Sequence, residues 1–283
     1  MLRVAHFGPT GNLGAPTFEH LTSRGHQVTV FVRSRERFHQ LHGHPEVEVV
    51  EGDARDARAV CEMLAGARFD AVVSTAGCVD NAVQDREDAQ ASSFCTIFNN
   101  LVDASERYLA APHRAVFLGG MTALSLPGTG NGVRLQSLLE RRSPQYGSHV
   151  LNHERLLRSS LDWTLVCPAY MVDDAPAWDP TELRLSEDVV PAFGPSARFR
   201  RWQLARPFRL PFVLLPVSRR QGELTVPYAS VARALVDHLE PNGRFSRRCM
   251  GLANPPGRTL KKGEEQRARE RAVRAARDAE YDS

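Results

Sequence analysis

Paired cysteines, long apolar runs and a strong excess of one charge are all missing from this sequence. The cysteines are odd in number, scattered and never arranged as C-x-x-C, which is typical of free thiols in a reducing compartment; they are Cys61, Cys78, Cys95, Cys167 and Cys249. No apolar run approaches the roughly 18 to 20 residues that a membrane span requires. The net charge of +3 is too small to argue for nucleic acid as a partner.

What is present is an ordinary globular composition. Of the 283 residues, 42% are hydrophobic and 24% are charged, and a chain of this size buries most of its surface without needing a metal or a disulfide. Because the first strand is expected to begin at Leu2, no room is left for a cleavable targeting peptide. Cytoplasm is therefore the default location, and an uncleaved mitochondrial signal stays open as the alternative.

Three glycines follow the first apolar strand. Leu2–Phe7 reads as a buried strand, the next residues have the spacing G-x-x-G-x-x-G, a helical run follows, and Gln27–Val32 reads as a second strand. In this βαβ context the glycines let the backbone approach a pyrophosphate, and the helix N-terminus offers N–H groups to it. The residues expected to bind a dinucleotide are Gly8, Thr10, Gly11, Asn12, Leu13 and Gly14. The alternative is a tight turn that binds nothing.

Arginines stand where an NAD-selective site usually has an acid. Arg33 lies 33 − 14 = 19 residues after Gly14, at the end of the second strand, and Arg35 follows it. A guanidinium there pairs with a 2′-phosphate in a forked geometry. The pattern therefore favours NADP(H) over NAD(H), against the alternative of a solvated strand end.

Five further stretches follow in a fixed order: VEVVEGDARD (Val47–Asp56), DAVVSTAG (Asp70–Gly77), NNLVDASE (Asn99–Glu106), HERLLRSSLDWTLVCPAYM (His153–Met171) and GELTVPYASVARALVDHL (Gly222–Leu239). With the glycine turn, they resemble the atypical short-chain dehydrogenase/reductase group, in particular its NmrA-like and flavin reductase (biliverdin reductase B) type. The resemblance covers roughly residues 2–170 and 222–240. It implies that Asp53 lies beside the adenine and that Thr75, Ala76 and Gly77 cover the ribose.

The order of the elements predicts an α/β fold. Strands are expected near 2–7, 27–32, 47–51, 70–75, 114–119 and 162–167, with helices between them, which gives a doubly wound parallel sheet of the Rossmann type. Residues 1–170 are expected to form the dinucleotide-binding domain, 171–221 a small substrate-side or docking lobe, 222–257 a returning strand and helix, and 258–283 a charged tail.

The usual proton donor of short-chain reductases is missing. Those enzymes use Tyr-x-x-x-Lys, but Tyr146 is followed by Val150 at the lysine position and no lysine precedes Lys261. The flavin reductase-like members also lack this pair, and their flat acceptors take a hydride directly. We expect Thr122 and Tyr170 to face a small-molecule acceptor, where the relatives carry a serine and a histidine. A local turn bond for Thr122 and simple packing for Tyr170 are the alternatives.

Histidines at metal-like spacing have a plainer interpretation. His149 and His153 are four apart on an expected helix, but no third ligand is evident nearby, so no metal site is predicted. The cluster from His39 to His44 reads as a solvated loop.

The segment 197–220 stands outside the resemblance. It holds seven arginines interleaved with aromatic and aliphatic residues, and no acid lies between Asp188 and Glu223. A substrate-covering lobe and a docking surface for a larger assembly are the favoured readings. A peripheral membrane contact and a nucleic-acid contact are the weaker ones.

Together these features predict an NADPH-dependent oxidoreductase that passes a hydride to a flavin or quinone. The alternative is a non-catalytic NADPH-binding protein, either an accessory subunit of a large complex or a redox-sensing regulator.

Overall fold

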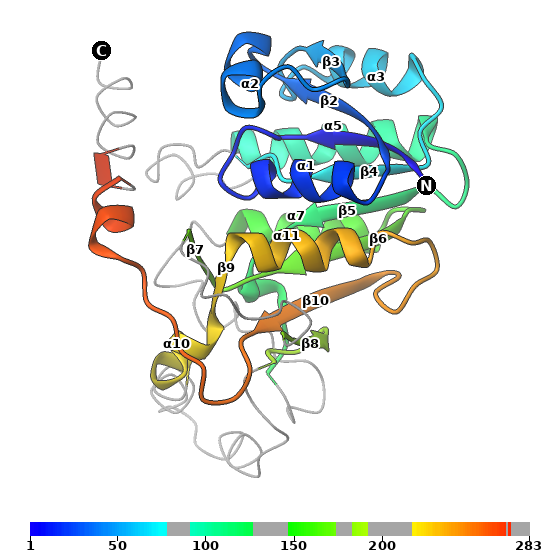
Figure 1. Ribbon diagram of the computed structural model, residues 1–283. Helices are drawn as coiled ribbons and strands as arrows, with labels where there is room; N and C mark the ends of the chain where they lie inside the picture. The colour runs from blue at the N-terminus through cyan, green and yellow to red at the C-terminus, as the bar shows by residue number, and fades with distance from the viewer. Residues whose placement is uncertain (78–90, 127–146, 174–182, 192–216, 270, 273–283) are drawn as a thin grey trace.

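The computed structural model describes residues 1–77, 91–126, 147–173, 183–191, 217–269 and 271–272 (Figure 1). Its main feature is an eight-stranded sheet in the order β3-β2-β1-β4-β5-β6-β10-β8, parallel except for the antiparallel pair β10–β8. The strands are β1 (Arg3–Phe7), β2 (Gln27–Val32), β3 (Glu48–Glu51), β4 (Ala71–Ser74), β5 (Arg114–Leu118), β6 (Asp162–Cys167), β8 (Arg184–Glu187) and β10 (Arg248–Ala253). The predicted doubly wound parallel sheet is confirmed, and its six predicted strands lie within a residue of their expected limits.

Helices cover both faces of this sheet, as expected. One face carries α1 (Gly14–Ser23), α2 (Arg35–His42) and α11 (Tyr228–Asp237), and α1 and α11 lie side by side in front of the strands (Figure 1). The other face carries α3 (Ala57–Ala65), α5 (Ser93–Tyr108) and α7 (Gly147–Leu157). Side chains alternate along β1, so Val4 packs with the first set of helices while Ala5 and Phe7 pack with the second.

Helix starts are set by short polar residues. Ser34, Asp56 and Ser92 precede α2, α3 and α5, and each side-chain oxygen accepts a hydrogen bond from a backbone N–H in the first turn. Because the first N–H groups of a helix have no partner within it, such caps fix where each helix begins. In α2 and α3 they also place the helix at the end of the preceding strand.

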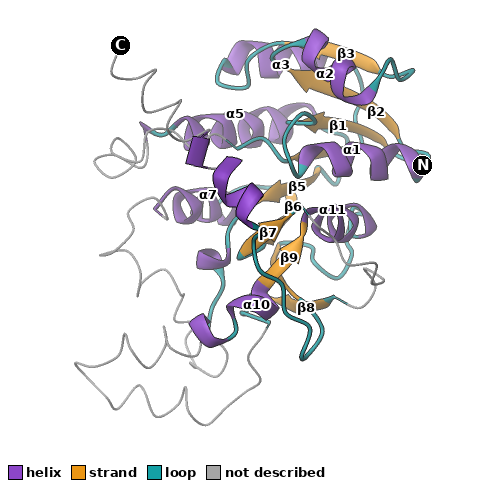
Figure 2. Cartoon of the chain, turned by 60° about the vertical axis from the view of Figure 1, so that its left-hand side comes forward, coloured by secondary structure: helices purple, strands orange, loops and turns teal. Residues whose placement is uncertain are grey.

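A second, two-stranded sheet lies beyond the end of β6. It pairs β7 (Tyr170–Val172) with β9 (Thr225–Pro227) in parallel (Figure 2), and the short α10 (Gln221–Leu224) leads into β9. The charged tail is anchored here: Gln266 is 6% exposed, and its amide donates to the carbonyl of Met171 at 3.1 Å. The first part of the tail is therefore not wholly solvated, because the uncharged amide of Gln266 contacts the backbone of β7.

A charged side chain is buried inside the sheet. The side chain of Arg114, the first residue of β5, is 1% exposed. Its guanidinium donates to the carbonyls of Leu239 at 3.1 Å and His238 at 2.6 Å, and to Thr164 Oγ1 at 2.8 Å. The carboxylate of Asp162 lies 3.5 Å away. These contacts tie β5 and β6 to the end of α11, and they satisfy a cation that burial would otherwise make costly.

Candidate functional site

The candidate site lies at the carboxyl edge of the parallel sheet. Gly8 follows β1, Arg33 follows β2, Asp53 lies just past β3, Thr75 follows β4 and Gly119 follows β5. Parallel strands bring these five ends to one edge, and ligands of open α/β sheets bind in the crevice there. The residues predicted to hold the dinucleotide are thus on a common edge, although they come from separate parts of the chain.

Two of the three glycines are required by the protein itself. Gly8 has φ +85°, and a Cβ there would lie 2.6 Å from the backbone nitrogen of Ala76. A Cβ on Gly14 would lie 1.8 Å from the carbonyl oxygen of Gly8. These glycines let the turn fold back on itself and pack against the end of β4.

Gly11 is different, because no contact with a described residue requires a glycine there. It is exposed, its φ is not in the left-handed region, and an added Cβ would meet only the carbonyl oxygen of Gly8 at 3.6 Å, an ordinary contact. The missing side chain leaves an open backbone face immediately before the first turn of α1. This is the geometry that a pyrophosphate needs at a helix N-terminus, so the residues present fit a bound dinucleotide.

A buried histidine supports the glycine turn. Thr75 Oγ1 lies 3.2 Å from the carbonyl oxygens of Phe7 and Gly8, and also 3.2 Å from His6 Nε2. Since the hydroxyl has one proton to donate to the carbonyls, it is left to accept the Nε2–H of His6. Burial, with a smaller contribution from His42, lowers the pKa of His6 to about 3, so the ring is neutral. The hydroxyl of Thr75 therefore faces the glycine turn.

The two arginines after β2 have different surroundings. Arg35 donates from its guanidinium to the carbonyl of Val49 at 2.5 Å, and its backbone N–H donates to Glu51 Oε2 at 3.0 Å. Arg33 is exposed, and no hydrogen bond or ion pair joins it to another residue in the described part of the chain. Of the two predicted phosphate ligands, Arg33 is thus the one whose guanidinium is not held by a hydrogen bond, although its charge helps to lower the pKa of Asp53.

Asp53 lies in the turn after β3, where it was expected. Its carboxylate accepts from Arg55 Nε at 2.9 Å and Nη2 at 2.5 Å. Hydrogen bonding by Arg55 lowers the pKa of Asp53 despite partial burial, so the carboxylate is ionised at neutral pH. The pair fixes the position of Asp53 at the outer end of the carboxyl edge.

The two residues expected to face an acceptor, Thr122 and Tyr170, lie just beyond the ends of β5 and β6. The 3-10 turn η2 (Met121–Ala123) follows Gly120, and the Met121 N–H donates to the carbonyl of Pro168 at 3.1 Å. This bond joins the ends of β5 and β6, so Thr122 and Tyr170 lie on the same edge. Thr122 is 5% exposed and Tyr170 is 40% exposed.

A comparison with family models shows which family the chain belongs to. The model described as NAD(P)H-binding matches residues 8–206, which includes the glycine turn and every strand end described above. The chain belongs to the NAD(P)H-binding family. The resemblance to the atypical short-chain group is confirmed at this level. A search of curated proteins finds no significant match.

Several solved structures share the fold of this NAD(P)H-binding chain. A Streptococcus pneumoniae TIGR4 protein, provisionally named an NADH-flavin reductase, is 20% identical, with a TM-score of 0.59 over 90% of this chain and 100% of its own. An anaerobillin reductase from Escherichia coli O157:H7 is 17% identical, with a TM-score of 0.57 over 92% and 100%. A short-chain dehydrogenase/reductase from Veillonella parvula DSM 2008, in complex with NADP, is 15% identical, with 0.59 over 93% and 100%. At these identities the likeness establishes a shared fold.

The histidines at metal-like spacing have other partners. His153 Nε2 lies 3.3 Å from Cys249 Sγ, and its ring packs edge-on against Trp163. His149 lies one turn earlier, against Gly120 and Phe94. Within the described residues, no group of three or more His, Cys, Asp or Glu is placed to hold a metal ion.

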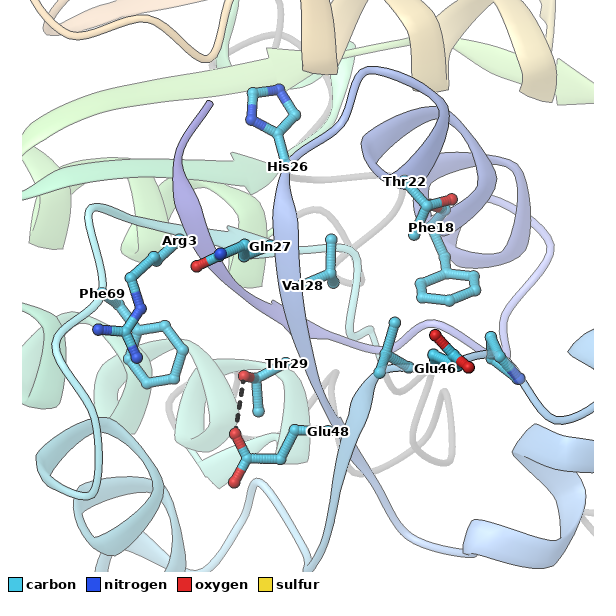
Figure 3. A pocket seen from close by; sticks show the side chains of 12 residues that line it. Arg3, Phe18, Thr22, His26, Gln27, Val28, Thr29, Glu46, Glu48 and Phe69 are labelled. Carbon is cyan, nitrogen blue, oxygen red and sulfur yellow. Dashed lines mark hydrogen bonds between the residues drawn. The ribbon is translucent and has the colours of Figure 1, made fainter.

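A hollow of about 540 Å³ lies at the opposite, amino-terminal edge of the NAD(P)H-binding sheet (Figure 3). Its lining includes Arg3, Gln27 and Glu48, the first residues of β1, β2 and β3, and a hydrogen bond of 3.2 Å joins Thr29 to Glu48. It faces away from the glycine turn and has no part in the cofactor site.

Other sequence predictions lie outside the described residues. These are Tyr146 and most of the arginine-aromatic segment, of which only residues 217–220 are described. In the described part of the chain, no helix combines the length and the apolar character needed to cross a bilayer.

Proposed function

We propose that this chain is an NADPH-dependent oxidoreductase that passes a hydride to a flat acceptor such as a flavin or a quinone. Membership of the NAD(P)H-binding family supports the cofactor class. The observation that carries the choice of NADPH is Arg33, an exposed guanidinium at the strand end where the ribose 2′ position is recognised. No hydrogen bond or ion pair holds it among the described residues, although its charge helps to lower the pKa of Asp53.

The groups next to Arg33 are already engaged in other hydrogen bonds, which supports Arg33 as the phosphate ligand. The N-terminus of α2 is already occupied, because Glu51 accepts from the N–H of Arg35 and Ser34 Oγ accepts from the N–H of Arg37 at 3.1 Å. The guanidinium of Arg35 is turned to Val49. A planar fork such as that of Arg33 matches a phosphate in charge and in shape.

When bound, NADPH supplies a hydride from its nicotinamide. Gly11 and the start of α1 would hold its pyrophosphate, and the loop from Gly119 to Ala123 would line the site of the reacting ring. A flat acceptor needs little proton assistance, so placement over the nicotinamide provides most of the catalysis. This accounts for a site without Tyr-x-x-x-Lys.

The test is a fluorescence titration of the purified chain with NADPH and with NADH. We expect NADPH to bind at least tenfold more tightly, which is about 1.4 kcal/mol. Arg33→Ala should lose this preference, while NADH binding stays within about twofold. The control is Arg68→Ala, which removes an exposed arginine just before β4, at the amino-terminal edge. An unchanged NADPH/NADH ratio in Arg33→Ala would show that Arg33 does not read the phosphate.

Turnover separates the enzyme from the non-catalytic alternative. The wild-type chain should oxidise NADPH in the presence of riboflavin or menadione. If NADPH binds tightly but is not consumed with either, and the chain elutes from native extract at a mass far above a dimer, the NADPH-binding subunit is the better description.

A further inference from the structure

Around η2 and α7, the helix packed against it, four buried polar atoms have no hydrogen-bond partner among the described residues: Thr122 Oγ1, His149 Nδ1, Asn152 Nδ2 and His153 Nδ1. The ring of His153 faces Cys249 and Trp163, which leaves the other three. Thr122 and Asn152 are only 5% and 2% exposed. Leaving a buried donor or acceptor unsatisfied costs about 1–3 kcal/mol, and such groups in native proteins call for an explanation. A ligand that supplies the missing hydrogen-bond partners is one such explanation.

His149 is the member closest to the end of β5. Its ring lies against Gly120, where an added Cβ would be 3.1 Å from Nε2 and 3.2 Å from Cδ2 and Cε1. On another side it meets Phe94 edge-on, with ring centroids 5.2 Å apart. The absence of a side chain at Gly120 therefore lets the imidazole pack against the turn that follows β5, two residues before Thr122.

All three groups are uncharged. The imidazole of His149 is neutral because burial lowers its pKa to about 4. A hydroxyl, a neutral imidazole and a carboxamide each offer hydrogen bonds without a formal charge. They complement a ring that carries carbonyl oxygens and ring nitrogens, and they give no compensation to a buried carboxylate.

We propose that His149, together with Thr122 and Asn152, binds the reacting ring of the acceptor, and that the acceptor is a neutral carbonyl-bearing ring such as a quinone or an isoalloxazine. This rests on the proposed function. The C–H bond of the dihydronicotinamide breaks, and its hydrogen and electron pair pass to the acceptor. Negative charge then gathers on an acceptor oxygen or nitrogen, to which the His149 N–H donates a hydrogen bond. The balancing proton comes from water, and the imidazole stays neutral.

Such a donor acts mainly on the charge that develops during hydride transfer. Removing one preorganised donor of this kind commonly costs about a hundredfold or more in kcat. The effect should therefore appear in kcat more than in cofactor affinity. A group with a merely structural role would lower thermal stability and NADPH binding together.

The experiment compares His149→Phe and His149→Gln with wild type, using menadione and riboflavin as acceptors. His149→Phe keeps a flat ring without a donor, and we expect its kcat to fall at least tenfold with NADPH binding unchanged within twofold. His149→Gln, which restores an N–H donor, should recover part of the loss. The control is His26→Gln, a half-buried histidine at the amino-terminal edge.

Binding of riboflavin in the presence of NADP⁺, followed by its fluorescence, tests the site without turnover. If the wild type binds riboflavin and His149→Phe binds it at least tenfold more weakly, the assignment stands even where no turnover is seen. Equal riboflavin binding and equal kcat in the two proteins would overturn it. Loss of NADPH binding in His149→Phe would also overturn it. So would a wild type that binds neither acceptor but reduces biliverdin, because the three uncharged side chains do not match the carboxylates of biliverdin.

Discussion

Two glycines three residues apart should respond in opposite ways to the same substitution. In Gly14→Ala the new Cβ would lie 1.8 Å from the Gly8 carbonyl oxygen, 2.8 Å from its carbon and 2.9 Å from Thr75 Oγ1. The first two are backbone atoms, so the turn itself must move. Overpacking of this kind costs about 1–3 kcal/mol, which lowers Tm by roughly 2–12 °C in a domain near this size.

In Gly11→Ala the new Cβ would meet the Gly8 oxygen at 3.6 Å, and the fold should not change. The methyl group would instead occupy the open backbone face that the pyrophosphate needs. We expect an unchanged Tm and a loss of at least tenfold in NADPH affinity, about 1.4 kcal/mol.

Differential scanning calorimetry and a cofactor titration on both variants test this reasoning. Both should be measured without cofactor for stability, since a bound ligand raises Tm by itself. If Gly11→Ala binds NADPH as wild type does, the pyrophosphate does not lie against Gly11. If Gly14→Ala has the same Tm as wild type, the packing of the turn against β4 is not as tight as described.

Two further predictions concern buried charge. Below about pH 6.5, His6 is protonated in the unfolded chain, whereas in the folded chain it stays neutral down to about pH 3. The contribution of His6 to the free energy of unfolding should therefore fall by about 5 kcal/mol between these two pH values. Urea unfolding between about pH 7 and pH 4.5 should show that the free energy of unfolding declines less with falling pH in His6→Leu than in wild type. Parallel plots of this free energy against pH for the two proteins would contradict this account. Arg114→Met leaves the carboxylate of Asp162 and three backbone carbonyls, those of Asp162, His238 and Leu239, without their buried donor. It should destabilise the fold by about 3–5 kcal/mol in the same assay. Arg58→Met, at an exposed arginine of α3, should remain close to wild type.

The sequence was sufficient for the cofactor half of the fold. Apolar strands such as Gln27–Val32, separated by helices with recognisable caps, leave few topologies for a parallel sheet, and the spacing of Gly8 to Gly14 locates the turn. The position of Arg33 at the end of β2 was predictable for the same reason, because its distance from Gly14 is fixed by one helix and one strand.

The acceptor side was less accessible to sequence reasoning. The spacing of His149 and His153 placed them on one face of a helix, but it could not show that one ring meets Gly120 and the other Cys249. His6 was overlooked because it sits in an apolar strand, and its partner Thr75 is 69 residues away. The antiparallel strand β8 and the anchoring of Gln266 on β7 also depend on contacts between distant parts of the chain, which periodicity does not encode.

The strand order has a consequence for the chain while it is being synthesised. The first 118 residues supply β3, β2, β1, β4 and β5, so β5 forms the free edge of a half-built sheet until β6 emerges. Arg114 stands on that edge, and two of its carbonyl partners, on His238 and Leu239, follow more than 120 residues later. A cation on an open edge opposes pairing with the edge of another molecule. We therefore expect Arg114, which ties the finished sheet together, also to oppose edge-to-edge aggregation of the half-built sheet during synthesis.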